Sequence, residues 1–226
     1  MNNNIFVACD VSSQKEILEL LSKIHEKISG IKIGLQYITK HSPEEIKELS
    51  KFNKPIFYDG KFFDIKNTLI ESVKSLKNLN ISYATVHLLN GLDALKAANE
   101  VANDIKIKLL GVSVLTSFSD KDLDLLGFKD QVDHQVQRLI KIASEANLYG
   151  VICSPLEIKM IKKNAPNLKC FTPGIRQNEN ENKHDQKRTM NAKQALEAGS
   201  DCLIIGRPIT MGDPKKNILK ILSSLK

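Results

Sequence analysis

The sequence predicts an α/β protein built as a (β/α)8 barrel, and three observations support this prediction. Short apolar runs alternate with amphipathic segments along the whole 226-residue chain, which is typical of parallel strands joined by helical crossovers. The length lies near the low end for a closed eight-fold barrel. The first apolar run continues as CDVSSQKE, without the glycine-rich turn that is usual in the alternative, an open doubly wound sheet.

The expected strands are the apolar runs at 5–10, 31–36, 55–62, 82–89, 108–115, 150–155, 169–174 and 201–207. The expected helices have apolar residues three and four positions apart, at 12–28, 42–52, 67–79, 92–103, 131–147, 155–165, 191–199 and 213–226. Helix N-caps are expected at Ser12, Ser42 and Asp213. No linker interrupts the pattern, so residues 1–226 are expected to form a single TIM-barrel domain.

Composition narrows the class of protein. No run of about 18 apolar residues and no secretory signal are visible, so we expect no membrane partner and a cytoplasmic location. The four cysteines each lie in an expected strand and are interpreted as buried thiols. The net charge of +7 comes from lysines spread along helical faces, so we expect no nucleic-acid partner.

Charged residues gather at the carboxyl ends of the expected strands, where a barrel enzyme forms its active site. Asp10 ends the first strand, Lys32 lies in the second, and the third carries Asp59 and Lys61, two positions apart and so on one face. A lysine held between carboxylates stays protonated and can act as a proton donor. Asp64 lies past the strand end and is free to project elsewhere. The rim offers few metal ligands and its lysines repel cations, so no metal is expected.

A second group of polar residues follows the seventh and eighth strands, the usual position of a phosphate site in a barrel. The polar stretch at about 175–188 is expected to be a phosphate-binding loop carrying Arg176 and Gln186. Gly206 permits close backbone approach and Arg207 offers a fork-shaped donor. The alternative is that these arginines pair with acidic residues of the same loop, such as Glu179, Glu181 and Asp185.

From Asp10 to about Pro214 the chain resembles the orotidine 5′-phosphate decarboxylase family. The matching motifs are DGKFFDIKNT (59–68), VSVLTS (112–117), CSP (153–155), TPGIR (172–176), DQKR (185–188) and GRPI (206–209). The resemblance implies a carboxy-lyase that converts orotidine 5′-monophosphate (OMP) to UMP in de novo pyrimidine biosynthesis, without a cofactor. Lys66 stands where many members of the family have proline, which leaves the local loop geometry open.

The resemblance also implies roles for individual residues. Lys61 is expected to protonate C6 of the pyrimidine, with Asp59 beside the departing carboxylate. Asp64, Ile65 and Thr68 are expected to enter the site of a neighbouring subunit, which makes the enzyme a homodimer with shared active sites.

Substrate-binding roles follow in the same way. The resemblance assigns ribose contacts to Asp10 and Lys32, the base pocket to Thr116 and Pro173, and the phosphate or its closing loop to Arg176, Gln186, Gly206 and Arg207. His87 is interpreted as a structural histidine.

Two other functions stay open from the sequence. Mg²⁺-dependent sugar-phosphate decarboxylases and lyases of the same superfamily resemble the chain at D-x-K-x-x-D, although the I-x-N-T, VLTS and DQKR segments argue against them. A non-catalytic nucleotide-binding barrel is the alternative from another class.

Overall fold

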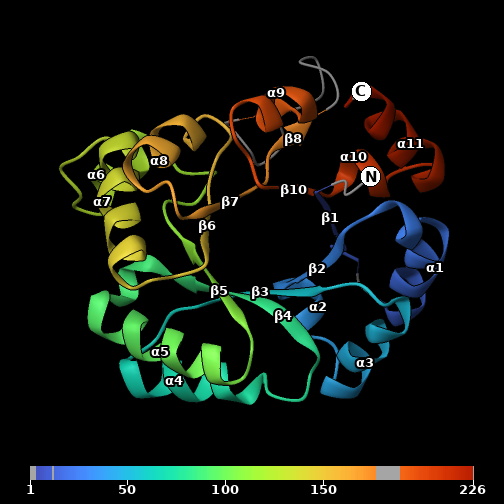
Figure 1. The fold of residues 1–226 in the computed structure, drawn as a ribbon, viewed down its shortest axis with the longest axis horizontal. Helices are drawn as coiled ribbons and strands as arrows, with labels where there is room; N and C mark the ends of the chain where they lie inside the picture. The colour runs from blue at the N-terminus through green and yellow to red at the C-terminus, as the bar shows by residue number, and fades with distance from the viewer. Residues whose placement is uncertain (1–3, 12, 177–188, 226) are drawn as a thin grey trace.

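A closed barrel of parallel strands forms the centre of the molecule. The computed structural model describes residues 4–11, 13–176 and 189–225. In this part of the chain, eight strands follow one another around the barrel in the order β1-β10-β7-β6-β5-β4-β3-β2 (Figure 1). The ring closes where β1 pairs in parallel with β10, with Ile5 opposite Leu203. The predicted (β/α)8 fold class is therefore confirmed.

The strands are shorter than the apolar runs that predict them. They are β1 Ile5–Ala8, β2 Gly30–Gly34, β3 Ile56–Phe62, β4 Ile81–His87, β5 Lys108–Val112, β6 Gly150–Ile152, β7 Lys169–Thr172 and β10 Cys202–Ile205. The apolar runs continue past the hydrogen-bonded ladder because the first loop residues are also buried, as at Val114 and Cys153. A separate parallel pair, β8 Ile175–Arg176 and β9 Met190–Asn191, was not predicted.

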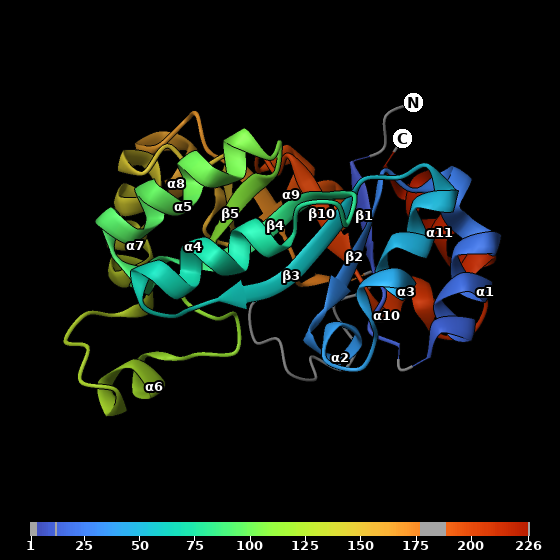
Figure 2. The ribbon, with the colours of Figure 1, turned by 90° about the horizontal axis from the view of Figure 1, so that it is seen from below.

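Helices surround the barrel, as Figures 1 and 2 show. They are α1 Gln14–Ile24, α2 Leu35–Ile38, α3 Pro43–Glu48, α4 Lys66–Ser75, α5 Leu92–Asp104, α6 Asp120–Leu125, α7 Val132–Glu145, α8 Ile158–Asn164, α9 Ala192–Glu197, α10 Arg207–Thr210 and α11 Pro214–Ser224. Short 3-10 turns lie at His25–Lys27, Leu49–Phe52 and Leu88–Asn90. The helices α2, α6 and α10 are additional to the prediction, and α6 is set apart from the others in Figure 2. Within the described ranges no helix is apolar over the length that a bilayer crossing requires.

Side-chain caps fix where several helices begin. Ser42 and Asp213 cap α3 and α11 as predicted, and at α3 Ser42 and Glu45 form a reciprocal capping box. The prediction for α1 is wrong by one residue, because the cap is Ser13, whose Oγ accepts from the Glu16 N–H at 3.2 Å. Ser12 itself lies outside the described residues.

Aromatic rings fill the interior of the barrel near the amino ends of the strands. Phe6, Phe57, Tyr83 and Phe171 meet with ring centroids 5.3–6.4 Å apart. The Lys108 ammonium lies 4.5 Å from the centroid of the Tyr149 ring, a cation–π contact that closes this end of the cluster. This end of the barrel interior is therefore filled with aromatic side chains, and a pocket of about 420 Å³ borders Phe6, Tyr83 and Phe171 there.

Asp201, just before β10, joins three segments at the opposite end of the barrel. Its carboxylate accepts from Lys162 of α8, from Lys169 at 3.0 Å and from the Cys170 N–H at 2.8 Å. Burial opposes ionisation of this carboxyl, but the donors outweigh burial and hold the pKa of Asp201 below its ordinary value. The ionised form is therefore favoured by folding.

We predict that Asp201→Asn lowers the free energy of unfolding by about 1–3 kcal/mol at pH 7, because the Cys170 N–H, Lys162 and Lys169 lose a charged acceptor. The sign with pH follows from the lowered pKa. Stability from ionised Asp201 is present above its unfolded pKa of about 3.9 and is lost as pH falls through the folded pKa.

Urea unfolding of the two proteins between pH 3 and 7 measures this effect. The difference should shrink below about pH 4. Asp104→Asn, at the exposed end of α5, is the matched control and should change stability by less than about 0.5 kcal/mol. Equal stability of wild type and Asp201→Asn at pH 7 would contradict the assignment.

Candidate active site

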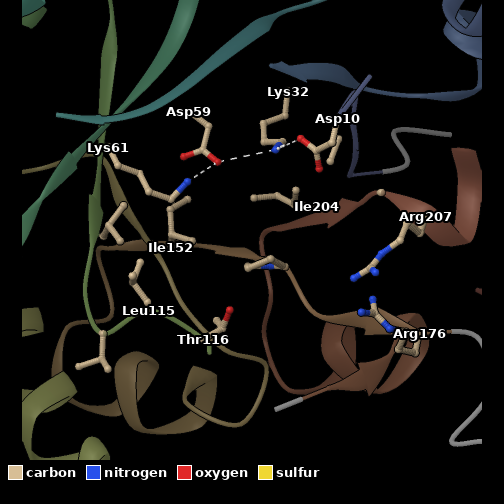
Figure 3. A pocket seen from close by; sticks show the side chains of 15 residues that line it. Asp10, Lys32, Asp59, Lys61, Leu115, Thr116, Ile152, Arg176, Ile204 and Arg207 are labelled. Carbon is tan, nitrogen blue, oxygen red and sulfur yellow. Dashed lines mark hydrogen bonds and ion pairs between the residues drawn. The ribbon is translucent and has the colours of Figure 1, made fainter. Parts of the chain in front are cut away.

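A cavity of about 270 Å³ opens at the carboxyl ends of the barrel strands (Figure 3). Its lining consists of Ala8, Asp10, Lys32, Asp59, Lys61, Val112, Val114, Leu115, Thr116, Ile152, Pro173, Arg176, Ile204, Gly206 and Arg207. Most of the site residues predicted from the sequence are therefore brought together at one place. The apolar members, such as Leu115 and Ile152, were not predicted as site residues.

Four charged side chains form an alternating row along one side of the cavity, and we call them the charged row. Lys32 Nζ lies 2.8 Å from Asp10 Oδ1 and 3.7 Å from Asp59 Oδ2. Lys61 Nζ lies 2.9 Å from the same Asp59 oxygen. Figure 3 shows the row running from Asp10 to Lys61 along the strand ends. Asp59 is thus shared by two ammonium groups.

Lys32 is the most deeply buried member of the charged row, with 7% of the residue exposed. Burial disfavours its charge, but Asp59 and Asp10 outweigh burial and raise the pKa of Lys32 above its ordinary value. Lys32 is therefore an ammonium at neutral pH. It is a permanent donor and cannot serve as a base.

A bulge in β3 brings Asp59 and Lys61 together. Tyr58 pairs with Ala84 and Phe62 with Val86, so three residues of β3 lie opposite the single residue Thr85 of β4. Lys61 has φ of +49°, a left-handed conformation that is uncommon for lysine. Simple strand alternation predicts that both side chains lie on one face. They do meet, but through an irregular backbone, and such strain clusters at functional sites.

Gly34 borders the charged row and was not predicted from the sequence as a site residue. A Cβ at this position would lie 3.1 Å from both Asp10 Oδ1 and Lys32 Nζ. Glycine therefore leaves the room that the ion pair between Asp10 and Lys32 occupies. The only signal in the sequence was a glycine at the end of an apolar run.

Arg176 and Arg207 lie on the side of the cavity away from Lys61, as Figure 3 shows. Arg176 extends from β8 and donates from one guanidinium nitrogen to the Ile175 carbonyl at 2.9 Å, while Arg207 begins α10. Gly206 lies next to Arg207 in the lining, and a Cβ there would come within 3.8 Å of Asp10 Oδ2. Two cations thus lie at the end of the cavity opposite the proton-donor candidate. Gln186, also predicted here, lies outside the described residues.

Asp64, Ile65 and Thr68 do not line the cavity of their own chain and are exposed. Asn90 fixes the loop that carries Asp64: its Oδ1 accepts from the Asp64 N–H at 3.1 Å and its Nδ2 donates to the Phe62 carbonyl at 2.9 Å. Lys66, the departure from the family pattern, forms an ion pair with Asp93 at 2.8 Å. The loop is therefore ordered, with Asp64 directed to the surface.

His87, at the end of β4, is likewise absent from the cavity lining. Burial and the nearby Lys61 ammonium lower the pKa of His87, so the ring is neutral at pH 7. Its Nδ1 accepts from the Leu89 N–H at 3.3 Å, and its ring centroid lies 5.4 Å from that of Phe63. These contacts match the structural role expected from the sequence.

Comparisons with known proteins agree with this geometry. The chain is 38% identical over 225 residues to orotidine 5′-phosphate decarboxylase of Wolbachia pipientis subsp. Culex pipiens, covering 99% of both proteins. It is 38% identical over 226 residues to the same-named protein of Wolbachia sp. subsp. Brugia malayi, covering 98% of this chain and all of the relative. The crystal structure of orotidine 5′-phosphate decarboxylase from Lactobacillus acidophilus superposes with a TM-score of 0.86 at 32% identity, over 98% of each chain.

The family model described as "Orotidine 5'-phosphate decarboxylase / HUMPS family" matches residues 3–221, almost the whole chain. The match includes every strand of the barrel and both sides of the cavity. This chain therefore belongs to the orotidine 5′-phosphate decarboxylase / HUMPS family.

Proposed function

We propose that this chain decarboxylates orotidine 5′-monophosphate to UMP in pyrimidine biosynthesis. One observation carries the proposal: the Lys61 ammonium, paired with the half-buried Asp59 carboxylate, faces a partly apolar cavity whose far side holds two arginines. The names of the curated relatives support the same activity.

The cavity divides into parts that suit the parts of a nucleotide. Arg176 and Arg207 offer fork-shaped donors for a phosphate. Asp10 and Lys32, the half of the charged row away from Lys61, offer an acceptor and a donor for ribose hydroxyls. Thr116 and Pro173, together with apolar lining residues, form the remaining wall, which suits a flat pyrimidine. With this arrangement we expect the pyrimidine to lie toward Lys61.

The proposed reaction breaks the bond between C6 and its carboxyl carbon. Carbon dioxide leaves, the bonding electron pair stays on C6, and a proton from Lys61 Nζ then forms the new C6–H bond. Lys61 regains its proton from solvent. A fixed ammonium stabilises the developing negative charge before it delivers the proton, and groups already in place cost no reorganisation during the reaction.

Asp59 has two proposed tasks. It holds Lys61 in position, at 2.9 Å, and it lies where the substrate carboxylate is expected to leave.

The phosphate of the substrate is remote from the breaking bond, so its binding energy can organise the site. We therefore expect a strong dependence of the rate on a group that takes no part in the chemistry.

A Mg²⁺-dependent sugar-phosphate reaction, the closest alternative, is less well supported. Asp10 Oδ1 and Asp59 Oδ2 are both bound by lysine ammonium groups, whose positive charge repels a hard cation at the same place. The curated relatives at 35–38% identity are named for the OMP reaction.

We predict that the purified protein converts OMP to UMP, which is measured as a loss of orotate absorbance. EDTA should leave the rate unchanged. Lys61→Ala should lower kcat by at least about 100-fold, because both the proton and its charge are lost. Orotidine, which lacks the phosphate, should lose several orders of magnitude in kcat/KM.

Two results would refute parts of this proposal. A folded protein that binds UMP without turning over OMP would support the non-catalytic alternative. A loss in kcat/KM below about tenfold for orotidine would refute the use of phosphate binding energy.

We also propose that two copies form a homodimer in which Asp64 completes the partner's site. Asp64 lies in a loop between two exposed apolar residues, Phe63 at 62% and Ile65 at 74% exposure. Apolar side chains this exposed on an ordered loop suit burial against another surface. Thr68, one turn into α4, is exposed on the same segment.

Subunit mixing tests this shared site. We predict that Lys61→Ala and Asp64→Asn homodimers are each nearly inactive, whereas an equilibrated 1:1 mixture recovers about a quarter of wild-type activity. Half of the dimers in the equilibrated mixture are heterodimers, and each heterodimer contains one site in which Lys61 and the partner's Asp64 are both intact. A mixture that forms heterodimers, seen by native mass spectrometry, yet stays inactive would contradict the proposal.

We propose a cytoplasmic location because of the state of the four cysteines. Cys9, Cys153, Cys170 and Cys202 are all buried free thiols, as expected in a reducing compartment. Cell fractionation tests the location, and recovery in a secreted fraction would contradict it.

A further inference from the structure

Thr85 connects Asp59 and Lys61, two neighbours in the charged row, from outside the cavity. It lies on β4, is completely buried, and is absent from the cavity lining. Its Oγ1 accepts from the Lys61 backbone N–H at 2.8 Å and donates to Asp59 Oδ1 at 3.0 Å. The direction of both bonds is fixed, because an amide can only donate and a carboxylate can only accept.

We propose that Thr85 is a positioning residue that sets the geometry of Asp59 and Lys61. The inference rests on the proposed decarboxylase function and adds a residue outside the substrate pocket to it. A single hydroxyl acts on the backbone of one charged residue and on the side chain of the other.

The effect on Asp59 is to assign its two oxygens different partners. Thr85 occupies Oδ1, which leaves Oδ2 for Lys61 at 2.9 Å and Lys32 at 3.7 Å. Without the hydroxyl, the carboxylate can rotate about its last bond. Both ammonium groups then lose a fixed acceptor.

The effect on Lys61 is to hold its unusual backbone. Thr85 is the one β4 residue opposite the three-residue bulge, and the Lys61 N–H at φ +49° is bound by a side chain instead of a ladder carbonyl. A left-handed non-glycine residue persists only where surrounding contacts determine it. The hydroxyl therefore stabilises the conformation that aims the lysine into the cavity.

The chain offers a variant that removes only this function and a matched control. Thr85→Val keeps the shape and removes the hydroxyl, whereas Thr85→Ser retains it. Ser200→Ala removes another buried hydroxyl, one bound to Thr172 at 2.8 Å and to the Cys202 carbonyl at 3.1 Å between β7 and β10. Thermal unfolding of all three reports the general cost of the lost bonds.

We expect Thr85→Val to lower kcat by tenfold or more while the Kd for UMP changes less than threefold, since phosphate and ribose contacts remain. Thr85→Ser should stay within threefold of wild type. Ser200→Ala should lose stability without losing kcat.

The split between kcat and UMP affinity is a readout that a purely structural role does not produce. A loss of packing alone should lower the stability of Thr85→Val without a selective loss of kcat, and Thr85→Ser should not rescue it.

Unchanged kcat in folded Thr85→Val would overturn the inference. If that variant does not fold, hydrogen exchange of the wild-type protein decides: the Lys61 amide should be protected, and rapid exchange there refutes its bond to Thr85. Failure of the proposed function is distinguishable, because it appears as a wild-type protein without OMP turnover, whereas the exchange measurement does not depend on activity.

Discussion

The buried ammonium of Lys32 is the constraint on which the active site depends. An ion this far from water costs several kcal/mol unless fixed opposite charges compensate it. Asp10 from the end of β1 and Asp59 from β3 supply that compensation, at 2.8 and 3.7 Å. The requirement sets the relative positions of three neighbouring strand ends, and Gly34 leaves the space in which the pair fits. Removal of either carboxylate would leave an uncompensated charge in the barrel.

Once Lys32 is fixed, the rest of the charged row follows. Asp59 is held from both sides, by the ammonium groups at Oδ2 and by Thr85 at Oδ1, so it can fix the Lys61 ammonium. Thr85 also accepts from the N–H of the strained Lys61 backbone. The aromatic cluster near the amino ends of the strands keeps that part of the barrel interior apolar. Polar chemistry inside the barrel is therefore confined to the carboxyl ends of the strands. The arginines lie at the far side of the cavity, so substrate binding and proton delivery are separated in space. A rigid framework of this kind suits catalysis by electrostatic preorganisation.

Much of this was accessible from the sequence because residue type and position agreed. Charged residues at the ends of apolar runs are rare by chance, and a barrel brings such ends to one rim. The sequence could not reveal the β3 bulge, since the extra strand residues of a bulge leave no signal in the hydrophobic periodicity. It also missed Thr85 and Gly34, because a β-branched residue and a glycine within apolar runs read as ordinary strand residues. Strand ends were overestimated for a related reason: apolar character follows burial, and burial continues into the loops. The role of Asp64 depends on a second subunit and stays a prediction.

The most direct test of the central claim is a high-resolution crystal structure of the protein with UMP. The account predicts that Lys61 Nζ lies within about 3.5 Å of C6, hydrogen-bonded to Asp59, with the phosphate between Arg176 and Arg207. It also predicts the partner's carboxylate from the loop after β3 beside the same ammonium. A nucleotide bound with C6 turned away from Lys61, or a charged row broken in its presence, would contradict the account.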